Sequence, residues 1–240
     1  MMSNIEEKSF QERLDEIESR ICSACERADR ERSSVQLLAV SKTHAPDSVA
    51  EAADCGLSVF GESRVQEAMK KIPMCSGALR WHLIGHLQTN KAKYVARLFD
   101  MVHSVDSLRI MEALEKSCAQ NGKVMPVTLE VNISGEGSKY GLSPADLCDA
   151  LSRANQLPHL EPVGLMTMPP FAPDPEKSRR YFRKLRELRD ECEQQTGIPL
   201  PELSMGMSHD FEVAIEEGAT WIRLGTILFG KRGSVWKPST

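Results

Sequence analysis

Short apolar runs rich in β-branched residues alternate along this chain with segments long enough to form helices. The runs are VQLLAVSK from Val35, LSVFGE from Leu57, LRWHLIG from Leu79, DMVHSVD from Asp100, VMPVTLEVNI from Val124, LEPVGLMTM from Leu160, LSMG from Leu203 and TWIRLG from Thr220. Runs of this kind are typical of strands buried on both faces. The pattern therefore predicts a strand–helix repeat throughout most of the chain.

The helical segments carry start and stop residues of the expected kinds. Pro46 occupies a first helical position, and Gly56 lies just past the end of the same segment. Ser107 precedes another helical segment as a candidate cap, and Gly122 follows it as a stop. Proline suits the first turn, where no amide hydrogen is needed, and glycine suits the left-handed residue after a helix.

Two further helices are longer. An opening helix is predicted from Ile5 to about Arg30, before the first strand. The longest helix is predicted from Asp174 to Gly197, and it places three residues at core spacing, namely Tyr181, Leu185 and Leu188.

Parallel strands need crossover connections, so this alternation leaves two candidate folds, an open doubly wound sheet and a closed (β/α)8 barrel. Roughly eight strand–helix units in 240 residues favour the TIM barrel. No linker of Pro, Gly and Ser divides the chain. We therefore predict one α/β domain over 1–240, with an N-terminal helix over 1–30 and the barrel over 35–232.

Composition narrows the function classes. Hydrophobic residues make up 41% and charged residues 27%, which is ordinary globular usage. A formal net charge of −4 argues against a nucleic-acid-binding protein, and no apolar run is long enough to cross a membrane. Seven scattered cysteines without an export signal predict reduced thiols and a cytoplasmic location.

Two tempting metal motifs are rejected. Cys22 and Cys25 form a single CxxC without a second pair, so two thiols on a helix are the simpler interpretation. His82 and His86 have the spacing of a metalloprotease helix, but the segment lacks the glutamate and is predicted as strand followed by turn. The pair would not share a helical face.

Lys42 is the first candidate for chemistry, because barrel enzymes place their reactive groups at the C-terminal ends of strands. It follows the first strand and shares a strand face with the apolar Leu38 and Val40. Partial burial would lower the pKa of a lysine there and make its amine a nucleophile for a carbonyl. A solvent-facing lysine in a loop is the alternative.

The end of the chain supplies a candidate anion site. Arg223, Gly225 and Thr226 close the eighth strand, and Ser208 follows the seventh at the start of a helical segment. Backbone amides and hydroxyls at these two loops are suited to a phosphate, although Ser208 could instead simply cap its helix. An aldehyde that carries a phosphate would use Lys42 and this cradle together.

A family resemblance extends from about Leu37 to Arg232. The segments LLAVSKTH, FGESRVQEAMKK, WHLIGHLQTNK, VNISGEGSKYGL, GLMTMPP, LSMGMSHDFEVAI and IRLGTILFGKR resemble, in order and spacing, the pyridoxal phosphate homeostasis protein family, also known as proline synthase co-transcribed homologue proteins. The resemblance implies a fold-type III barrel, like the N-terminal domain of bacterial alanine racemase, that binds pyridoxal 5'-phosphate (PLP).

The resemblance also implies roles for particular residues. Lys42 would form a Schiff base with PLP, and Arg223 would face the pyridine nitrogen. Ser208, Gly225 and Thr226 would hold the phosphate. A cation beside the pyridine nitrogen keeps that nitrogen unprotonated and weakens the ring as an electron sink.

Four more positions are carried over from the family. His82 and Met166 would line the cofactor near the ends of the third and sixth strands. Lys139, in SGEGSKYGL, would be a second lysine for cofactor handling. Ser63 stands where family members usually have Asn, and its shorter side chain would reach less far toward the cofactor.

The function that the resemblance implies is a PLP carrier and buffer, without catalysis, that supports vitamin B6 and amino-acid/keto-acid balance. The chain is expected to lack the C-terminal β domain of alanine racemase, leaving one cofactor face open. PLP-dependent apo-enzymes are candidate recipients, and a monomer is predicted.

Three alternatives remain. The first is a PLP-dependent racemase, decarboxylase or lyase acting on a small amino acid. The second is a Schiff-base aldolase or phosphosugar isomerase without PLP. The third is an interaction module that docks through the helix from Asp174.

Overall fold

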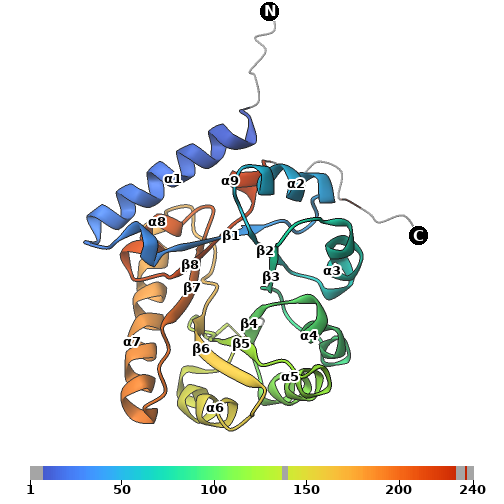
Figure 1. Ribbon diagram of the computed structural model, residues 1–240. Coiled ribbons are helices and arrows are strands. Elements are labelled where there is room, and N and C mark those ends of the chain that lie inside the picture. The colour runs from blue at the N-terminus through green and yellow to red at the C-terminus, as the bar shows by residue number, and fades with distance from the viewer. Residues whose placement is uncertain (1–7, 137–139, 231–235, 237–240) are drawn as a thin grey trace, which may run out of the picture.

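Eight parallel strands close into a barrel in the computed structural model (Figure 1), and their order around the ring is their order in the chain. The structure describes residues 8–136, 140–230 and 236. The strands are β1 Gln36–Val40, β2 Val59–Glu62, β3 Arg80–Leu83, β4 Met101–Val105, β5 Met125–Glu130, β6 Leu160–Met166, β7 Glu202–Met207 and β8 Trp221–Leu224. Pairing of β8 with β1 closes the ring, which confirms the predicted barrel and excludes the open sheet.

Helices fill the connections between strands and form an outer ring. They are α1 Phe10–Arg27, α2 Pro46–Asp54, α3 Val65–Lys71, α4 Val95–Leu98, α5 Leu108–Asn121, α6 Leu147–Ala154, α7 Arg179–Thr196, α8 Phe211–Glu216 and α9 Thr226–Phe229. Gly122 and Gly197 end α5 and α7 in the left-handed conformation, as predicted. Ser107 is the N-cap residue of α5, but its hydroxyl does not accept a helix amide and instead donates to Asp106.

The opening helix α1 begins later than predicted, at Phe10 instead of Ile5, which lies outside the described residues. Its start is set by a capping box, in which the Ser9 hydroxyl accepts from the amide of Glu12 and the Glu12 carboxylate accepts from the amide of Ser9. One face of α1 is buried, through Phe10, Leu14, Ile17, Ile21, Ala24 and Cys25. Figure 1 shows α1 lying across the outside of the barrel beside α8 and α9.

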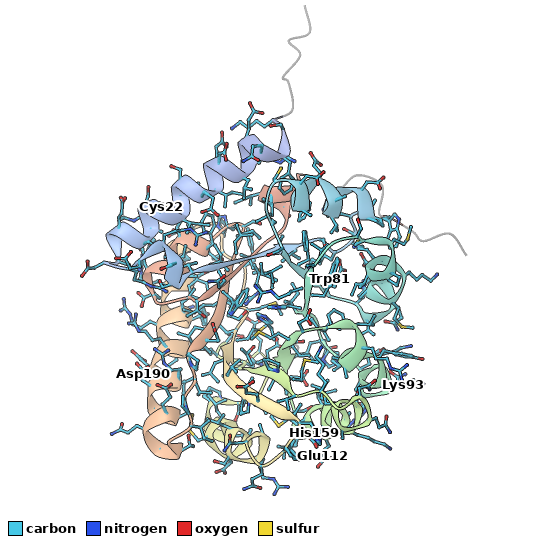
Figure 2. The ribbon with its side chains drawn as sticks, in the orientation of Figure 1. Cys22, Trp81, Lys93, Glu112, His159 and Asp190 are labelled. Carbon is cyan, nitrogen blue, oxygen red and sulfur yellow. A yellow bond between two sulfur atoms is a disulfide. The ribbon has the colours of Figure 1, made fainter. Side chains whose placement is uncertain are left out.

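Apolar side chains occupy two regions separated by the strands. A small cluster lies inside the ring, formed by Leu38, Val40, Val59, Ile84 and Trp221. The larger cluster lies between strands and helices. Side chains fill the space inside the ring of strands (Figure 2), so the interior is a packed core and not a pore. On α7, Phe182 is buried in place of the predicted Tyr181, which is half-buried, while Leu185 and Leu188 are buried as predicted.

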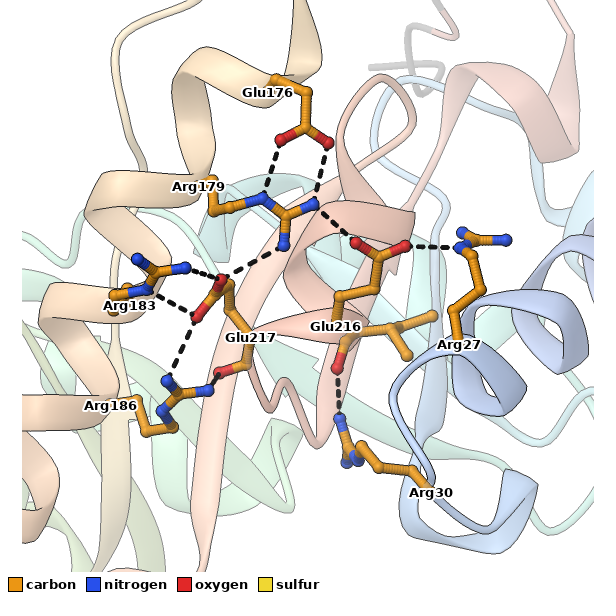
Figure 3. Close-up of polar contacts among 9 residues, drawn as sticks. Arg27, Arg30, Glu176, Arg179, Arg183, Arg186, Glu216 and Glu217 are labelled. Atoms are coloured by element: carbon orange, nitrogen blue, oxygen red, sulfur yellow. Dashed lines mark hydrogen bonds and ion pairs between the residues drawn. The ribbon is translucent and has the colours of Figure 1, made fainter.

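A network of ion pairs joins α1, α7 and the end of α8 (Figure 3). Glu217 accepts from Arg179 and Arg183 and pairs with Arg186, all three on α7. The Glu216 carboxylate accepts hydrogen bonds from Arg179 of α7 and from Arg27 of α1. The Glu217 side chain is only 4% exposed, so these charges fix the packing of the outer helices.

Cys148 on α6 and Cys192 on α7 form a disulfide. The prediction that all seven cysteines are reduced thiols is therefore wrong for this pair. The two residues are 44 positions apart in sequence, and only the side-by-side packing of α6 and α7 brings their Cα atoms to 5.4 Å. The remaining cysteines are free thiols, namely Cys22, Cys25, Cys55, Cys75 and Cys118.

Within residues 8–136, 140–230 and 236, no helix has the length and apolar content that a membrane span requires. The same part of the chain contains no group of three or more acidic, histidine or cysteine side chains that could hold a metal ion. The proposed division into a helix over 1–30 and a barrel over 35–232 stays a prediction.

Candidate functional site

The C-terminal ends of the strands bring the two most important candidates to neighbouring positions. In the β1–β8 register, Leu38 pairs with Arg223, so the two residues lie side by side in the ring. Lys42 lies two residues beyond the end of β1, in the turn that follows the strand. It is half-buried at the barrel mouth. Closure of the barrel thus unites residues that are 181 positions apart in the sequence.

Arg223 is buried at the end of β8 and held in a fixed orientation. Its Nη1 donates to Oγ of Ser204 at 2.7 Å, and its Nη2 donates to the carbonyl of Thr167 at 3.0 Å. Burial lowers the pKa of the guanidinium to about 10, although the negative charges of Glu130 and Asp210 act in the opposite direction. The group therefore remains a cation at neutral pH.

A chain of hydrogen bonds continues from Arg223 into the barrel. Ser204 Oγ lies 2.7 Å from Nδ1 of His103, and Nε2 of His103 lies 3.0 Å from Nδ1 of His82. Burial lowers the pKa of His82 to about 4 and that of His103 well below its usual value, so both rings are neutral at pH 7. Because Arg223 donates to Ser204, the hydrogen bonds have one consistent direction when Ser204 donates to Nδ1 of His103 and Nε2 of His103 donates to Nδ1 of His82.

His82 was expected to line the cofactor, and the structure places it in the barrel interior. It is 4% exposed, and its ring packs edge-on against Trp221 with centroids 4.9 Å apart. It reaches Arg223 through His103 and Ser204. Met166, the last residue of β6, is fully buried beside Glu130 in the β5–β6 register. Whether either residue contacts a cofactor stays a prediction.

The predicted cradle falls on the loops after β7 and β8, and its binding of a phosphate stays a prediction. The Ser208 hydroxyl accepts from the amides of Gly225 at 3.4 Å and Ile227 at 3.5 Å. Both amides therefore point toward one position, where an anion would accept shorter bonds. Thr226 is the first residue of α9, and its side chain is exposed.

Ser208 does not cap the following helix. The N-cap residue of α8 is Asp210, whose Oδ1 accepts from the amide of Met207 at 2.8 Å, and the helix begins only at Phe211. The interpretation of Ser208 as a helix cap is therefore wrong. Its hydroxyl is directed to the amides after β8.

Glu130 is a site residue that the sequence analysis missed. It ends β5, is 4% exposed, and lines a cavity of about 280 Å³ with Asn132, Met168 and Met207. Burial raises its pKa to about 7, the charge of Asp106 acts in the same direction, and Arg223 opposes them. The mouth thus contains a carboxyl group that titrates near neutral pH.

Ser63 and Lys139 are the two remaining predicted site residues. Ser63 follows β2 and lines a pocket of about 710 Å³ on the β2–β3 side of the mouth, together with Arg64, Lys91 and Tyr140. Its contact with a cofactor stays a prediction. Lys139 lies outside the described residues.

The missed residues have a signal in the sequence. His103, Glu130 and Ser204 are polar residues that are buried in strands of the barrel. A buried polar side chain needs a hydrogen-bond partner, so several of them on neighbouring barrel strands indicate an internal network. Its members become known only when the strand register is known.

Comparison with known proteins identifies the family. Residues 13–233 match the family model described as alanine racemase, N-terminal domain. The pyridoxal phosphate homeostasis protein of Aquifex aeolicus is 48% identical, and the match covers 92% of this chain and 97% of that protein. The chain belongs to the pyridoxal phosphate homeostasis protein family. The member from Pseudomonas aeruginosa is 42% identical over 92% of this chain and 95% of its own length.

Solved structures agree with the family assignment. PipY of Synechococcus elongatus, in a structure described as having PLP bound, superposes with a TM-score of 0.83 at 38% identity, covering 92% of this chain and all of that chain. Alanine racemase of Clostridium difficile superposes with a TM-score of 0.74 at 15% identity, covering 96% of this chain and 57% of that chain. The second likeness concerns the fold alone.

Proposed function

We propose that this member of the pyridoxal phosphate homeostasis family binds PLP as a Schiff base on Lys42 and carries and buffers it within the cytoplasm, in support of vitamin B6 and amino-acid/keto-acid balance. The observation that carries the proposal is the buried Arg223 guanidinium beside β1, with the Ser208–Gly225–Ile227 cradle on the adjoining loops. The 38% identity to PipY, whose structure is described as having PLP bound, supports it.

The residues present fit the chemical groups of PLP. The amides of Gly225 and Ile227, with the hydroxyls of Ser208 and Thr226, suit a phosphate. Nζ of Lys42 would attack the aldehyde carbon, and the carbonyl oxygen would leave as water. PLP supplies that electrophilic aldehyde and an electron-withdrawing ring. His82, Met166, Ser63 and Lys139 remain candidate lining residues.

Arg223 favours a carrier over an enzyme. Its guanidinium remains protonated at pH 7 and would present a cation to the ring nitrogen, which therefore would not gain a proton. An unprotonated ring stabilises carbanions poorly, so chemistry at the substrate carbon would be slow. The relatives from Aquifex aeolicus and Pseudomonas aeruginosa are named as homeostasis proteins and not as enzymes.

One observation favours the alternative of a PLP-dependent racemase or lyase. Glu130 has a pKa of about 7 at the barrel mouth, so it exchanges a proton at physiological pH. An enzyme would turn over a small amino acid, and that turnover would fall in Lys42→Ala and Glu130→Gln variants. Absence of turnover with bound PLP would favour the carrier.

The decisive experiment is an absorption spectrum, followed by borohydride reduction and peptide mass mapping. We expect a yellow protein whose reduced adduct maps to Lys42, and a Lys42→Ala variant that folds but forms no adduct there. The exposed Lys70 provides the matched control, Lys70→Ala, which should behave as wild type. A protein that gains no adduct with added PLP would overturn the proposal. That result would favour the alternative of a Schiff-base aldolase or phosphosugar isomerase without PLP.

The proposal includes a monomer that delivers PLP to apo-enzymes. Apo-enzyme reactivation in the presence of a PLP-trapping phosphatase separates direct transfer from release into solution. Sedimentation of the purified protein tests the monomer.

A further inference from the structure

A fully buried lysine lies beside the segment that carries Lys42. Lys71 is the last residue of α3 and is 0% exposed. Its Nζ donates to the backbone carbonyl of Ser41, to Oε1 of Glu62 and to Oε1 of Glu67, each at 2.8 Å. All three donor hydrogens of the ammonium therefore have partners, and one partner is the residue immediately before Lys42.

The residues on both sides of Lys42 are held by this cluster. The Ser41 hydroxyl donates to Oε1 of Glu62 at 2.7 Å, and the backbone amide of Thr43 donates to Oε1 of Glu67 at 2.5 Å. From the other side, the amide of Trp236 donates to the Thr43 carbonyl at 3.0 Å. The segment 41–43 is thus fixed through backbone groups on each side of Lys42.

Thr43 needs such support. Its φ of 69° lies in the left-handed region, which a β-branched residue rarely adopts without surrounding contacts that enforce it. The bond from its amide to Glu67 and the bond to its carbonyl from Trp236 are contacts of that kind. Loss of these contacts should release the strained backbone after Lys42.

Stabilisation of the fold is a poor explanation for the cluster of Lys71, Glu62 and Glu67. One ammonium faces two carboxylates in a buried place, and burial raises the pKa of Glu62 against the opposing charge of Lys71. Oε2 of Glu62 is buried without a hydrogen-bond partner among the described residues. Apolar side chains of similar size commonly stabilise a protein as well as buried ion pairs do.

We propose that Lys71, with Glu62 and Glu67, is a positioning group for Lys42. It acts through the backbone of Ser41 and Thr43, and it orients the amine of Lys42 for covalent capture of an aldehyde held in the cradle after β7 and β8. The inference rests on the proposed function, because it takes Lys42 as the residue of attachment.

The test separates covalent capture from anchoring of the phosphate. Pyridoxamine 5'-phosphate carries an amine in place of the aldehyde, so it can occupy the cradle without a bond to Lys42. We expect Glu67→Ala, which removes the Thr43 contact and leaves Lys71 paired with Glu62, to weaken PLP binding at least tenfold. Binding of pyridoxamine 5'-phosphate should change less than twofold, and Glu51→Ala, at an exposed position on α2, is the control.

Lys71→Met extends the test, with the exposed Lys70→Met as its control. Because Lys71→Met leaves two carboxylates unpaired and could unfold the chain, Glu62→Gln/Lys71→Met is made in parallel. Both variants should bind PLP at least tenfold more weakly and pyridoxamine 5'-phosphate with less than a twofold change. Equal losses for both ligands, or no loss of PLP binding in Glu67→Ala, would overturn the inference.

A readout without PLP distinguishes failure of the inference from failure of the proposed function. Amide hydrogen exchange over 41–44 in the ligand-free protein should accelerate at least tenfold in Glu67→Ala and stay unchanged in Glu51→Ala. If wild type forms no adduct on Lys42, the proposed function fails. The exchange measurement still shows whether Glu67 holds the backbone of residues 41–44. If wild type forms the adduct but exchange does not change, the positioning role fails.

Discussion

Thr226 is exposed and is proposed to contact the phosphate, so its hydroxyl can be removed with little effect on packing. Thr226→Val should weaken PLP binding by about 1–3 kcal/mol, because a phosphate oxygen loses a hydrogen-bond donor. Thr226→Ser keeps the hydroxyl and should bind nearly as wild type does. Spectroscopic titration with PLP measures both variants. Wild-type affinity in Thr226→Val would remove this hydroxyl from the site.

Glu130 gives the protein a specific dependence of stability on pH. A glutamate in the unfolded chain ionises near 4.5, whereas burial raises the pKa of Glu130 to about 7 in the folded state. Between these pH values unfolding releases a proton, so stability falls as pH rises and becomes level above about pH 7. The contribution of this group should fall by about 3 kcal/mol over that interval.

Glu130→Gln should lose this component of the pH dependence and be more stable than wild type above pH 7. Urea denaturation at pH 5 and pH 8 measures the difference, with the exposed Glu161→Gln on β6 as the control. Parallel pH dependence in wild type and Glu130→Gln would show that the carboxyl is ionised in both states.

At the scale of elements, the close packing of β7 on α8 positions the cradle. Gly206 has a φ of 88°, and a Cβ there would lie 2.6 Å from Cβ of Ala214 and 3.0 Å from Cα of Phe211. Only glycine allows this approach, which sets the path of the chain to Ser208. The identity of one residue thus decides where the hydroxyl after β7 lies.

Gly206→Ala should destabilise the protein by about 2 kcal/mol or more, through overpacking added to backbone strain. Gly197 also has a positive φ, 71°, but a Cβ there would meet no atom within 4 Å. Gly197→Ala therefore measures the backbone strain alone. Chemical denaturation should show a clearly larger loss for Gly206→Ala, and equal losses would contradict the packing argument.

At the scale of the whole molecule, buried charge joins the outer helices α1, α7 and α8 to one another. Burial raises the pKa of Glu217, but its hydrogen bonds from Arg183 and Arg179 outweigh that effect, and the pKa lies below the usual 4.5. A carboxylate with a lowered pKa stabilises the folded state above about pH 4.5, and this contribution is lost as pH falls. Acid should therefore weaken the ion pairs between α7 and the end of α8.

Glu217→Gln should reduce the free energy of unfolding at pH 7 by about 1–3 kcal/mol, because three guanidinium groups lose a buried carboxylate. The variant should also lose less stability than wild type on acidification below pH 4.5. Denaturation at pH 7 and pH 4 measures both effects, with the exposed Glu187→Gln on α7 as the control. A loss that is the same at both pH values would contradict the electrostatic explanation.

The apolar runs were sufficient to predict parallel strands, because a strand buried on both faces is apolar along its whole length. The number of strand–helix units in a chain of 240 residues then favoured the barrel over the open sheet. Pro46, Gly122 and Gly197 marked helix ends because their effects are local. Lys42, Arg223 and the cradle after β7 and β8 could be proposed as site residues because strand ends in a barrel share one face, and their contact with a cofactor stays a prediction. Each of these features depends on a few consecutive residues or on a general rule of the fold.

Only the tertiary structure decided which side chains meet. The path from Arg223 through Ser204 to His103 crosses strands and depends on their register. The disulfide between α6 and α7 depends on which helices lie side by side, which cysteine spacing does not encode. The burial of Lys71 beside the Lys42 segment likewise depends on the pairing of β1 with β2, which brings Ser41 and Glu62 together next to α3. Sequence pattern determined the elements, whereas long-range packing determined the environment of each charge, because burial and pairing exist only between elements.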